Sequence, residues 1–337
     1  MIPCALFNIN RMTFNFTATP DFDFITSFAG HIGAKVRDGY LDIPETLGKG
    51  YIRKMIFGSD FKITMHHYVL KEDLIIIRNS SGLGNELITV FFYSNQQSLG
   101  IAFNNTHKVM FSERDNSAIQ ITSNDLSSTI HFPAHEHIHY MVVAIKPARL
   151  KELIAFDSPN STMQTISASG NSFLYFENMA AETKLLLKNL VVIDLRDTLS
   201  NFYMQIKVQE LLYQVFYKLS LRESREHQTI NSGDAARLLY IRNEIIRDLS
   251  IPPVLRELSQ IAGMSETKLK QLFKQTFGTT IYNYFQQARM EEAAFLLKKG
   301  KRSVAEVGYE MGFSNLSHFS RLFEKHYGLS PKRFSYS

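Results

Sequence analysis

The 337-residue sequence contains one cysteine, Cys4, so an internal disulfide framework is impossible. It has no apolar run of the roughly 18 residues that a transmembrane helix needs. Residues 1–11 also lack the basic start and long apolar core of a signal peptide. We find no glycine-rich phosphate loop, nucleophile elbow or cysteine-based site, so we expect no catalytic residue, no cofactor and no enzyme activity. These absences favour a cytoplasmic protein that does not bind membranes.

Charge is unevenly spread along the chain. Residues 235–337 hold 16 Lys and Arg against 9 Asp and Glu, whereas the remaining residues hold 21 against 23. A length of 337 residues predicts about two domains of roughly 150 residues each. A basic module attached to a near-neutral one indicates a polyanion-binding domain and a separate second domain. Charge alone fits a solvated basic surface equally well.

The first half of the chain has the pattern of strands. Short segments rich in β-branched and aromatic residues lie between turn formers at 61–70, 74–78, 87–93, 118–122 and 140–146. Many short strands predict a small barrel or sandwich. We therefore assign residues 1–165 to a β-rich domain. Residues 80–85 are expected to form a hairpin loop, and the polar residues 158–171 a loop or linker.

A helical period replaces the strand pattern after Met179. Val208, Leu211, Leu212, Val215 and Leu219 share one face of a predicted helix, as do Leu186, Leu190 and Ile193 of the helix before it. The later helix also carries Phe202, Ile206 and Phe216, which is more apolar surface than one domain usually covers. Residues 175–222 are therefore predicted to be a helical dimerisation and linker segment, with packing on its own domain as the alternative. The polar residues 222–233 are the expected interdomain linker.

The last hundred residues contain an internal duplication. Residues 255–265 match residues 304–314 at an offset of 49, and after one inserted residue the match resumes at an offset of 50. In each copy a short helix is expected to end at a glycine, Gly263 or Gly312, because glycine adopts the left-handed conformation of a helix C-terminus. Ser265 or Ser314 is the expected N-cap of the next helix, which stops at the next glycine. Two helices joined by such a turn are a helix-turn-helix.

Signals flanking the two copies complete this pattern. Pro252 and Pro253 lie where the first helix should begin, and Ser303 with Glu306 forms a capping-box match before the second copy. Residues 279–298 are predicted to form one connecting helix of about 30 Å, close to the roughly 34 Å of one turn of B-DNA. Such a helix would hold two recognition helices in successive major grooves. A plain helical bundle with accidental symmetry is the alternative.

Several motifs of this region resemble one family. They are Ala262-Gly263-Met264-Ser265, residues 269–274 with Phe277-Gly278, residues 305–313, residues 318–323 and residues 327–334. Together they resemble the tandem helix-turn-helix domain of AraC/XylS-type regulators. The resemblance implies a seven-helix DNA-binding domain at 234–337 and an α+β chain, in which a cupin-like barrel and a helical dimerisation segment precede the all-α domain.

The resemblance also implies a function and partners. We expect a sequence-specific, ligand-responsive transcription regulator that forms a homodimer and binds double-stranded DNA at a promoter or operator. The β-rich domain would then hold an unknown small-molecule effector, and RNA polymerase would be a further partner. Activation is the commoner outcome among the proteins that it resembles.

Matching positions in the family nominate DNA-contacting residues. Base contacts are expected from Thr267, Lys270, Gln271, Ser317, His318 and Arg321. Arginine bonds bidentately to guanine and glutamine to adenine, which favours Arg321 and Gln271 as readers. Phosphate contacts are expected from Lys268, Lys274, Lys298, Lys299, Lys301, Arg302, Lys332 and Arg333. For each of them, a solvated surface charge is the alternative.

A group of histidines marks the β-rich domain, namely His131, His135, His137 and His139 together with Glu136, and with His66 and His67 upstream. On a strand, His135, His137 and His139 would share one face, where three imidazoles can bind a metal. The ligand order of a cupin metal site is not evident, and Pro133 favours a loop. We therefore expect these histidines to bind no metal and to line an effector pocket as polar side chains. A metal-dependent cupin-type enzyme and a DNA-binding architectural protein without effector are the competing functions.

Overall fold

The computed structural model describes residues 11–82, 86–94, 99–102, 109–111, 118–155, 158–191, 199–223 and 226–336. Residues 1–10, which include Cys4 and for which no signal peptide is expected, lie outside the described ranges, and so does Ile193. Contacts between residues divide the chain into two units, residues 1–236 and 237–337. The sequence predicted that the second domain begins at residue 234. Among the described residues, no helix combines the length and the apolar character that a membrane span requires.

The N-terminal unit contains a five-stranded sheet with the order β1-β6-β11-β8-β9. Strands β1 and β6 pair in parallel and the other pairs are antiparallel. Its strands are β1 (Arg11–Thr17), β6 (Asp73–Asn79), β8 (Leu99–Ala102), β9 (Val109–Phe111) and β11 (Ser128–Phe132).

A second, eight-stranded sheet has the order β13-β10-β7-β12-β5-β4-β3-β2, and all its pairs are antiparallel. Its strands are β2 (Val36–Arg37), β3 (Tyr40–Asp42), β4 (Gly48–Ile56), β5 (Phe61–Leu70), β7 (Ile88–Tyr93), β10 (Ile119–Ser123), β12 (Ile138–Ile145) and β13 (Leu174–Glu177). The strands predicted from the sequence are confirmed as β5, β6, β7, β10 and β12.

Both faces of the eight-stranded sheet are covered, which explains why β7 and β10 are buried at every position. On β12, Met141 and Val143 join the core beneath the helices, while Tyr140 and Val142 line a cavity toward the other sheet. Period-two alternation thus sends one set of side chains to each layer. The described strands form two facing sheets rather than one hydrogen-bonded cylinder, an arrangement that cupins and jelly rolls use.

Two expectations for connecting segments are wrong. Residues 80–85, which the structure describes in part, are not a hairpin loop, because β6 and β7 belong to different sheets. Residues 158–171 contain a helix, α3 (Ser161–Ser167), whose N-cap Asn160 accepts a hydrogen bond from the Met163 amide at 2.9 Å. The polar composition of this segment gave no helical pattern, because a helix this short buries only a few side chains, such as Met163 and Ile166.

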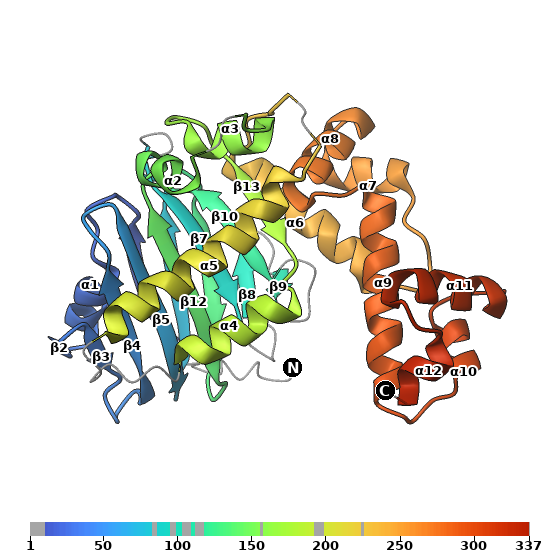
Figure 1. The fold of residues 1–337 in the computed structure, drawn as a ribbon, viewed down its shortest axis with the longest axis horizontal. Coiled ribbons are helices and arrows are strands. Elements are labelled where there is room, and N and C mark those ends of the chain that lie inside the picture. Colours follow the sequence, from blue (N-terminus) through green and yellow to red (C-terminus); the bar gives the residue numbers. More distant parts are fainter. Residues whose placement is uncertain are drawn as a thin grey trace, which may run out of the picture. The chain divides into compact units, whose positions relative to one another are not determined.

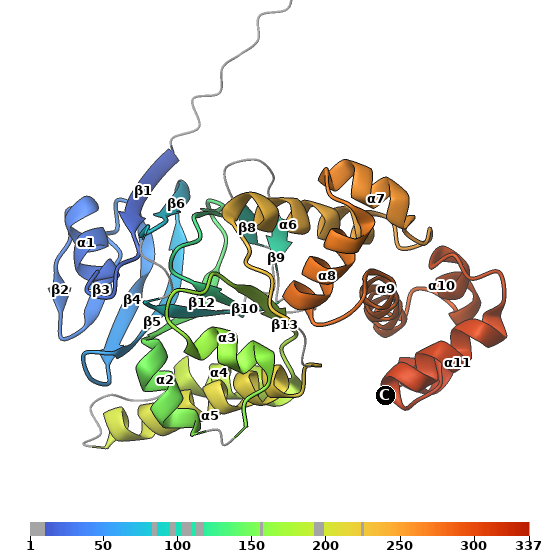
Figure 2. The same ribbon diagram turned by 90° about the horizontal axis from the view of Figure 1, so that it is seen from above.

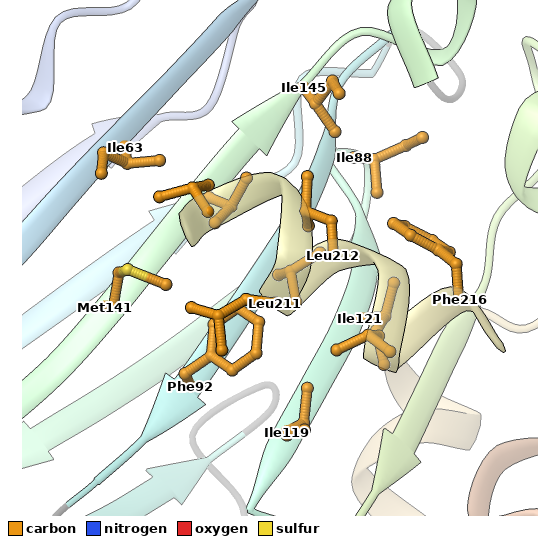
Figure 3. Packing of buried hydrophobic residues seen from close by; sticks show 14 of the residues in the cluster. Ile63, Ile88, Phe92, Ile119, Ile121, Met141, Ile145, Leu211, Leu212 and Phe216 are labelled. Carbon is orange, nitrogen blue, oxygen red and sulfur yellow. The ribbon is translucent and has the colours of Figure 1, made fainter. Parts of the chain in front are cut away.

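Helices cover the outer face of the eight-stranded sheet (Figures 1 and 2). They include α4 (Ala181–Val191), α5 (Ser200–Ser220) and the smaller α2 (Pro147–Ile154). Helix α1 (Phe24–His31) lies instead beside β1, where its Phe24 and Phe28 contact Phe14. The predicted apolar face of α5 is buried from Val208 to Leu219. Figure 3 shows Leu211, Leu212 and Phe216 among sheet residues such as Phe92 and Ile121. Each such side chain contributes roughly 1.5–3 kcal/mol by leaving water.

The segment expected to be helical from residue 175 begins as a strand, since β13 pairs with β10. The expected linker also packs on the sheet. Arg222 forms an ion pair with Glu177 at 2.7 Å, and the imidazole of His227 lies 3.2 Å from the carbonyl of Ser172.

Among the described residues of the C-terminal unit, all regular secondary structure is helical (Figure 1). They are α6 (Ser232–Arg247, which begins before the boundary), α7 (Leu255–Ala262), α8 (Glu266–Phe277), α9 (Ile281–Lys298), α10 (Val304–Glu310), α11 (Leu316–Tyr327) and α12 (Pro331–Tyr336). These seven helices of the described chain match the number implied by the resemblance.

Candidate nucleic-acid interface

The first helix-turn-helix comprises α7 and α8. Gly263 ends α7 with a φ of 59°, a left-handed conformation that costs glycine little. The Ser265 side chain then caps α8 by accepting a hydrogen bond from the Lys268 amide at 3.2 Å. The predicted turn and cap are therefore confirmed. Helix α7 begins only at Leu255, however, so Pro252 and Pro253 lie before the helix rather than in its first turn.

The second helix-turn-helix comprises α10 and α11. Its capping box is confirmed, because Ser303 and Glu306 exchange side-chain and backbone hydrogen bonds. The predicted cap Ser314 is wrong. Asn315 caps α11 instead, with its side-chain oxygen accepting from the amides of Ser317 and His318 at 2.9 and 3.1 Å. Asn315 is the inserted residue of the duplication, so the second turn is one residue longer and the matched helices stay in phase.

Helix α9 lies between the two helix-turn-helix motifs and packs within the C-terminal unit through its buried side chains. Toward α6, the Tyr284 hydroxyl accepts a hydrogen bond from Nε of the buried Arg242 at 3.0 Å. Toward the second turn, Nε of Arg289 donates to the Met311 carbonyl at 2.5 Å, and its guanidinium lies 3.9 Å from the centre of the Phe313 ring. At 18 residues, α9 is about 27 Å long.

Apolar packing fixes one face of each recognition helix and leaves the other face to solvent. On α8, Leu269, Leu272 and Phe273 are buried, and Phe273 meets Tyr284 of α9 edge-on at 5.6 Å. On α11, Phe319 and Phe323 are buried in a core shared with α9 and α10. Because 3.6 residues make one turn, the intervening positions project outward.

All six expected base-contact residues lie on these outward faces. Thr267 and Gln271 are exposed on α8, and Ser317 and Arg321 occupy the equivalent exposed positions of α11, 50 residues later. Lys270 lies 3.9 Å from Glu266 in an exposed pair, which is worth little in water. His318 is exposed in the first turn of α11, and its ring contacts Phe313 at 5.6 Å. The structure therefore gives each helix a polar outer surface near its N-terminus.

The expected phosphate-contact residues spread over several elements. Lys268 and Lys274 are on α8, Lys298 and Lys299 close α9, and Lys332 and Arg333 are on α12. All are exposed except Lys274, which is half-buried. Lys299 lies 4.3 Å above the Phe295 ring. Arg302 already pairs with Glu310 at 2.6 Å, so a phosphate would have to compete with that carboxylate.

The three histidines named in the β-rich unit do not share a strand face. His135 lies in a turn with a φ of 63°, and β12 begins after His137. His139 instead packs against His67, with ring centres 4.1 Å apart. Burial, together with the neighbouring imidazoles, lowers the pKa of His139 to about 4. Within the described ranges, no cluster of three or more His, Cys, Asp or Glu side chains is arranged to hold a metal.

A cavity of about 100 Å³ lies between the two sheets instead, and none of those three histidines lines it. Its walls come from β1, β5, β6, β7, β11 and β12 and are largely apolar. Four buried polar side chains also line it, those of His66, Arg78, Thr89 and Ser128. Sequence reasoning grouped His66 with the other histidines of the β-rich domain, but it singled out neither His66 nor Arg78 as an effector-binding residue. The signal for Arg78 was present, because it follows Leu74 and Ile76 at inward positions of β6.

Comparisons with known proteins converge on the C-terminal unit. A family model described as a helix-turn-helix domain matches residues 258–336. The transcriptional activator RhaR of Klebsiella pneumoniae is 36% identical over 83 residues, which are 25% of this chain and 30% of that protein. The transcriptional activator AggR of Escherichia coli is 33% identical over 94 residues, 28% of this chain and 35% of that protein.

Other similarities are broader but weaker. A probable transcriptional regulator of Photobacterium leiognathi, LumQ, is 26% identical over 178 residues, or 53% of this chain and 68% of that protein. Among solved structures, an AraC-type regulator from Chromobacterium violaceum has 27% identity and a TM-score of 0.29 over 31% of this chain and 94% of its own. The structure of ToxT from Vibrio cholerae has 13% identity and a TM-score of 0.35, and the match covers 83% of this chain and 98% of ToxT.

The C-terminal unit is thus a tandem helix-turn-helix domain of the AraC/XylS type, which confirms the resemblance found in the sequence. The matched segments span about a third of the length of RhaR and AggR.

Proposed function

We propose that this protein is a transcription regulator that binds double-stranded DNA at a promoter or operator through α8 and α11. One observation supports this most strongly. Two separately capped helices, joined by the roughly 27 Å of α9, expose polar residues at equivalent positions, Gln271 and Arg321 among them. That length suits two recognition helices in successive major grooves.

Selection of bound duplexes from a random-sequence pool by the full chain tests this function. We expect the enriched sequences to contain two conserved blocks whose centres are about 10–10.5 base pairs apart, since each helix would enter one groove on the same side of the DNA. A single block would mean that only one helix-turn-helix reads bases. Enrichment of no sequence would reject sequence-specific binding.

We further propose that DNA binding responds to a small-molecule effector held between the two sheets. This proposal is supported by the position of the cavity between strands of the two sheets and by its largely apolar walls, which are typical of ligand sites. The three histidines first proposed for effector binding lie outside it, so Arg78 and His66 take their place in this proposal.

We infer that the protein acts as a homodimer through the outer face of α5. Phe202, Ile206, Tyr213 and Tyr217 are exposed there and recur at spacings of four, seven and four residues, which align them along one side of a helix. Contiguous exposed apolar surface of this kind marks interaction sites.

Sedimentation at micromolar concentration tests the dimer. Tyr213→Glu places a charge in the middle of the stripe and should yield monomers, whereas Tyr309→Glu, an equally exposed tyrosine of α10, should leave the dimer intact. A Tyr213→Glu protein that stays dimeric would place the interface elsewhere.

Activation is the proposed outcome of DNA binding, with RNA polymerase as the second macromolecular partner. The support is that the relatives RhaR and AggR are both named transcriptional activators. In-vitro transcription from a selected site, with and without the protein, tests it; a fall in transcript would make the protein a repressor.

A further inference from the structure

Arg78 is a buried cation with unused hydrogen-bond donors. Its side chain is 4% exposed and lines the cavity between the sheets. One nitrogen, Nη2, donates to the Leu126 carbonyl at 2.9 Å, while Nε and Nη1 have no partner among the described residues. Burial lowers the pKa of Arg78 to about 10, partly offset by Tyr93 and Asp125. The guanidinium is therefore still charged at neutral pH.

The other charged groups near the cavity already have partners. Lys54 pairs with Asp23 at 2.5 Å, and Lys62 donates to the carbonyls of Pro20 and Phe22 at 3.1 and 2.7 Å. The Asp125 carboxylate accepts a hydrogen bond from the Ser172 hydroxyl, and the described residues show no ion pair between it and Arg78. A buried charge without a counter-ion is costly, so a ligand that supplied one would be favoured at Arg78.

The rest of the cavity suits an apolar molecule. Phe16, Ile76, Phe91, Ile130 and Val142 contribute to its walls. Its volume of about 100 Å³ approaches the roughly 150 Å³ of a dry cavity that admits benzene. His66 adds a second polar group, because its Nδ1 has no partner within the described part of the chain.

We propose that this cavity binds a small organic anion, a carboxylate on an apolar body about the size of a benzene ring, with Arg78 as its counter-ion. The guanidinium matches a carboxylate geometrically, because its planar donors can hold both oxygens. The inference rests on the proposed effector role of the cavity and names the chemical class of the effector.

Calorimetric titration of the full chain with benzoate, and with its neutral isostere benzamide, tests the charge requirement. We expect benzoate to bind and benzamide to bind at least about tenfold more weakly, since a hydrogen-bonded charge pair commonly supplies that difference. Equal affinities would show an apolar site without anion selectivity and overturn the proposal. So would a wild-type protein that binds neither benzoate nor hexanoate at millimolar concentration.

Arg78→Met removes the charge and keeps a long side chain, and Arg53→Met is its matched control. Arg53 is also 4% exposed and has an unpartnered Nε, but it lies outside the cavity. Arg78→Met should weaken benzoate at least about tenfold and melt no lower than the wild type, because an unpaired buried charge is gone. Arg53→Met should retain benzoate affinity.

Two results would overturn the assignment of Arg78. One is unchanged benzoate affinity in Arg78→Met combined with a lower melting temperature, which would make Arg78 a structural residue. The other is an equal loss of affinity in Arg53→Met. Binding of the selected DNA duplex is measured separately without benzoate. Lost anion binding with intact DNA binding rejects this inference alone, and the reverse rejects only the proposed DNA-binding function.

Discussion

Single exposed side chains on α8 and α11 are expected to carry the base preference of the protein. Arg321 is exposed one turn into α11, where an arginine can meet guanine O6 and N7 together. Arg321→Ala should cost about 1–3 kcal/mol of binding free energy on the selected site and relax preference at one base pair. Titrations against the selected duplex and its single-base variants measure both effects.

Lys299→Ala is the contrasting change, because a phosphate contact carries no sequence information. It should weaken selected and unrelated duplexes about equally and lower the salt dependence of binding. Selective loss on one sequence would instead make Lys299 a base reader. Unchanged operator affinity in Arg321→Ala would reject the role of Arg321.

Two glycines at matching turns differ in what surrounds them. Gly263 has a φ of 59° and open space where a Cβ would lie, so Gly263→Ala should cost about 1–2 kcal/mol of unfolding free energy from backbone strain alone. At Gly312, with a φ of 72°, a Cβ would lie 2.0 Å from the Ser250 carbonyl oxygen. Gly312→Ala should therefore destabilise the protein considerably more. Urea unfolding of both variants measures the difference, and equal losses would contradict the packing at Ser250.

At the scale of elements, the N-cap of α11 can be tested directly. Asn315→Ala leaves two backbone amides without their acceptor and should lower the unfolding free energy by about 1 kcal/mol. Ser314→Ala, one residue earlier in the exposed turn, should change it by only a few tenths. If denaturant melts gave the larger loss for Ser314→Ala, the cap would lie where the sequence repeat alone suggests.

The helices were predictable because their signals are local. Glycines, caps and apolar spacing around α7 to α11 lie within a few residues of the structure that they specify, and the duplication repeats them. The cap at Asn315 escaped prediction because Ser314 matched Ser265 at the first offset. Helix α3 escaped because only three of its residues are buried, too few for a clear period.

At the scale of the whole molecule, predictability declines because long-range pairing decides the outcome. Strands β6 and β7 follow each other in sequence but enter different sheets, and no local turn residue reveals this. Strands β5 and β6 likewise enter different sheets, and this brings His66 of β5 and Arg78 of β6 to one cavity. Composition suggested histidines as site residues, whereas sheet pairing left His135 in a surface turn and buried His66.

The buried His66 should make the stability of the protein depend on pH. Burial lowers the pKa of His66 to about 3, against about 6.5 in an unfolded chain. Below pH 6.5 the unfolded chain therefore binds a proton that the folded protein does not, and stability is lost as the pH falls. Between pH 7 and pH 5 this histidine should remove about 2 kcal/mol of unfolding free energy.

His66→Phe keeps an aromatic ring beside Tyr140, whose ring centre lies 4.0 Å from that of His66, but abolishes this titration. Urea unfolding at both pH values should show a loss on acidification that is smaller by about 2 kcal/mol than in the wild type. His139, whose pKa is also lowered, contributes to the remaining loss in both proteins. If His66→Phe had the same pH dependence as the wild type, the pKa of His66 in the folded protein would not be lowered. The space around His66 would then contain water, which contradicts a dry cavity that receives an apolar molecule.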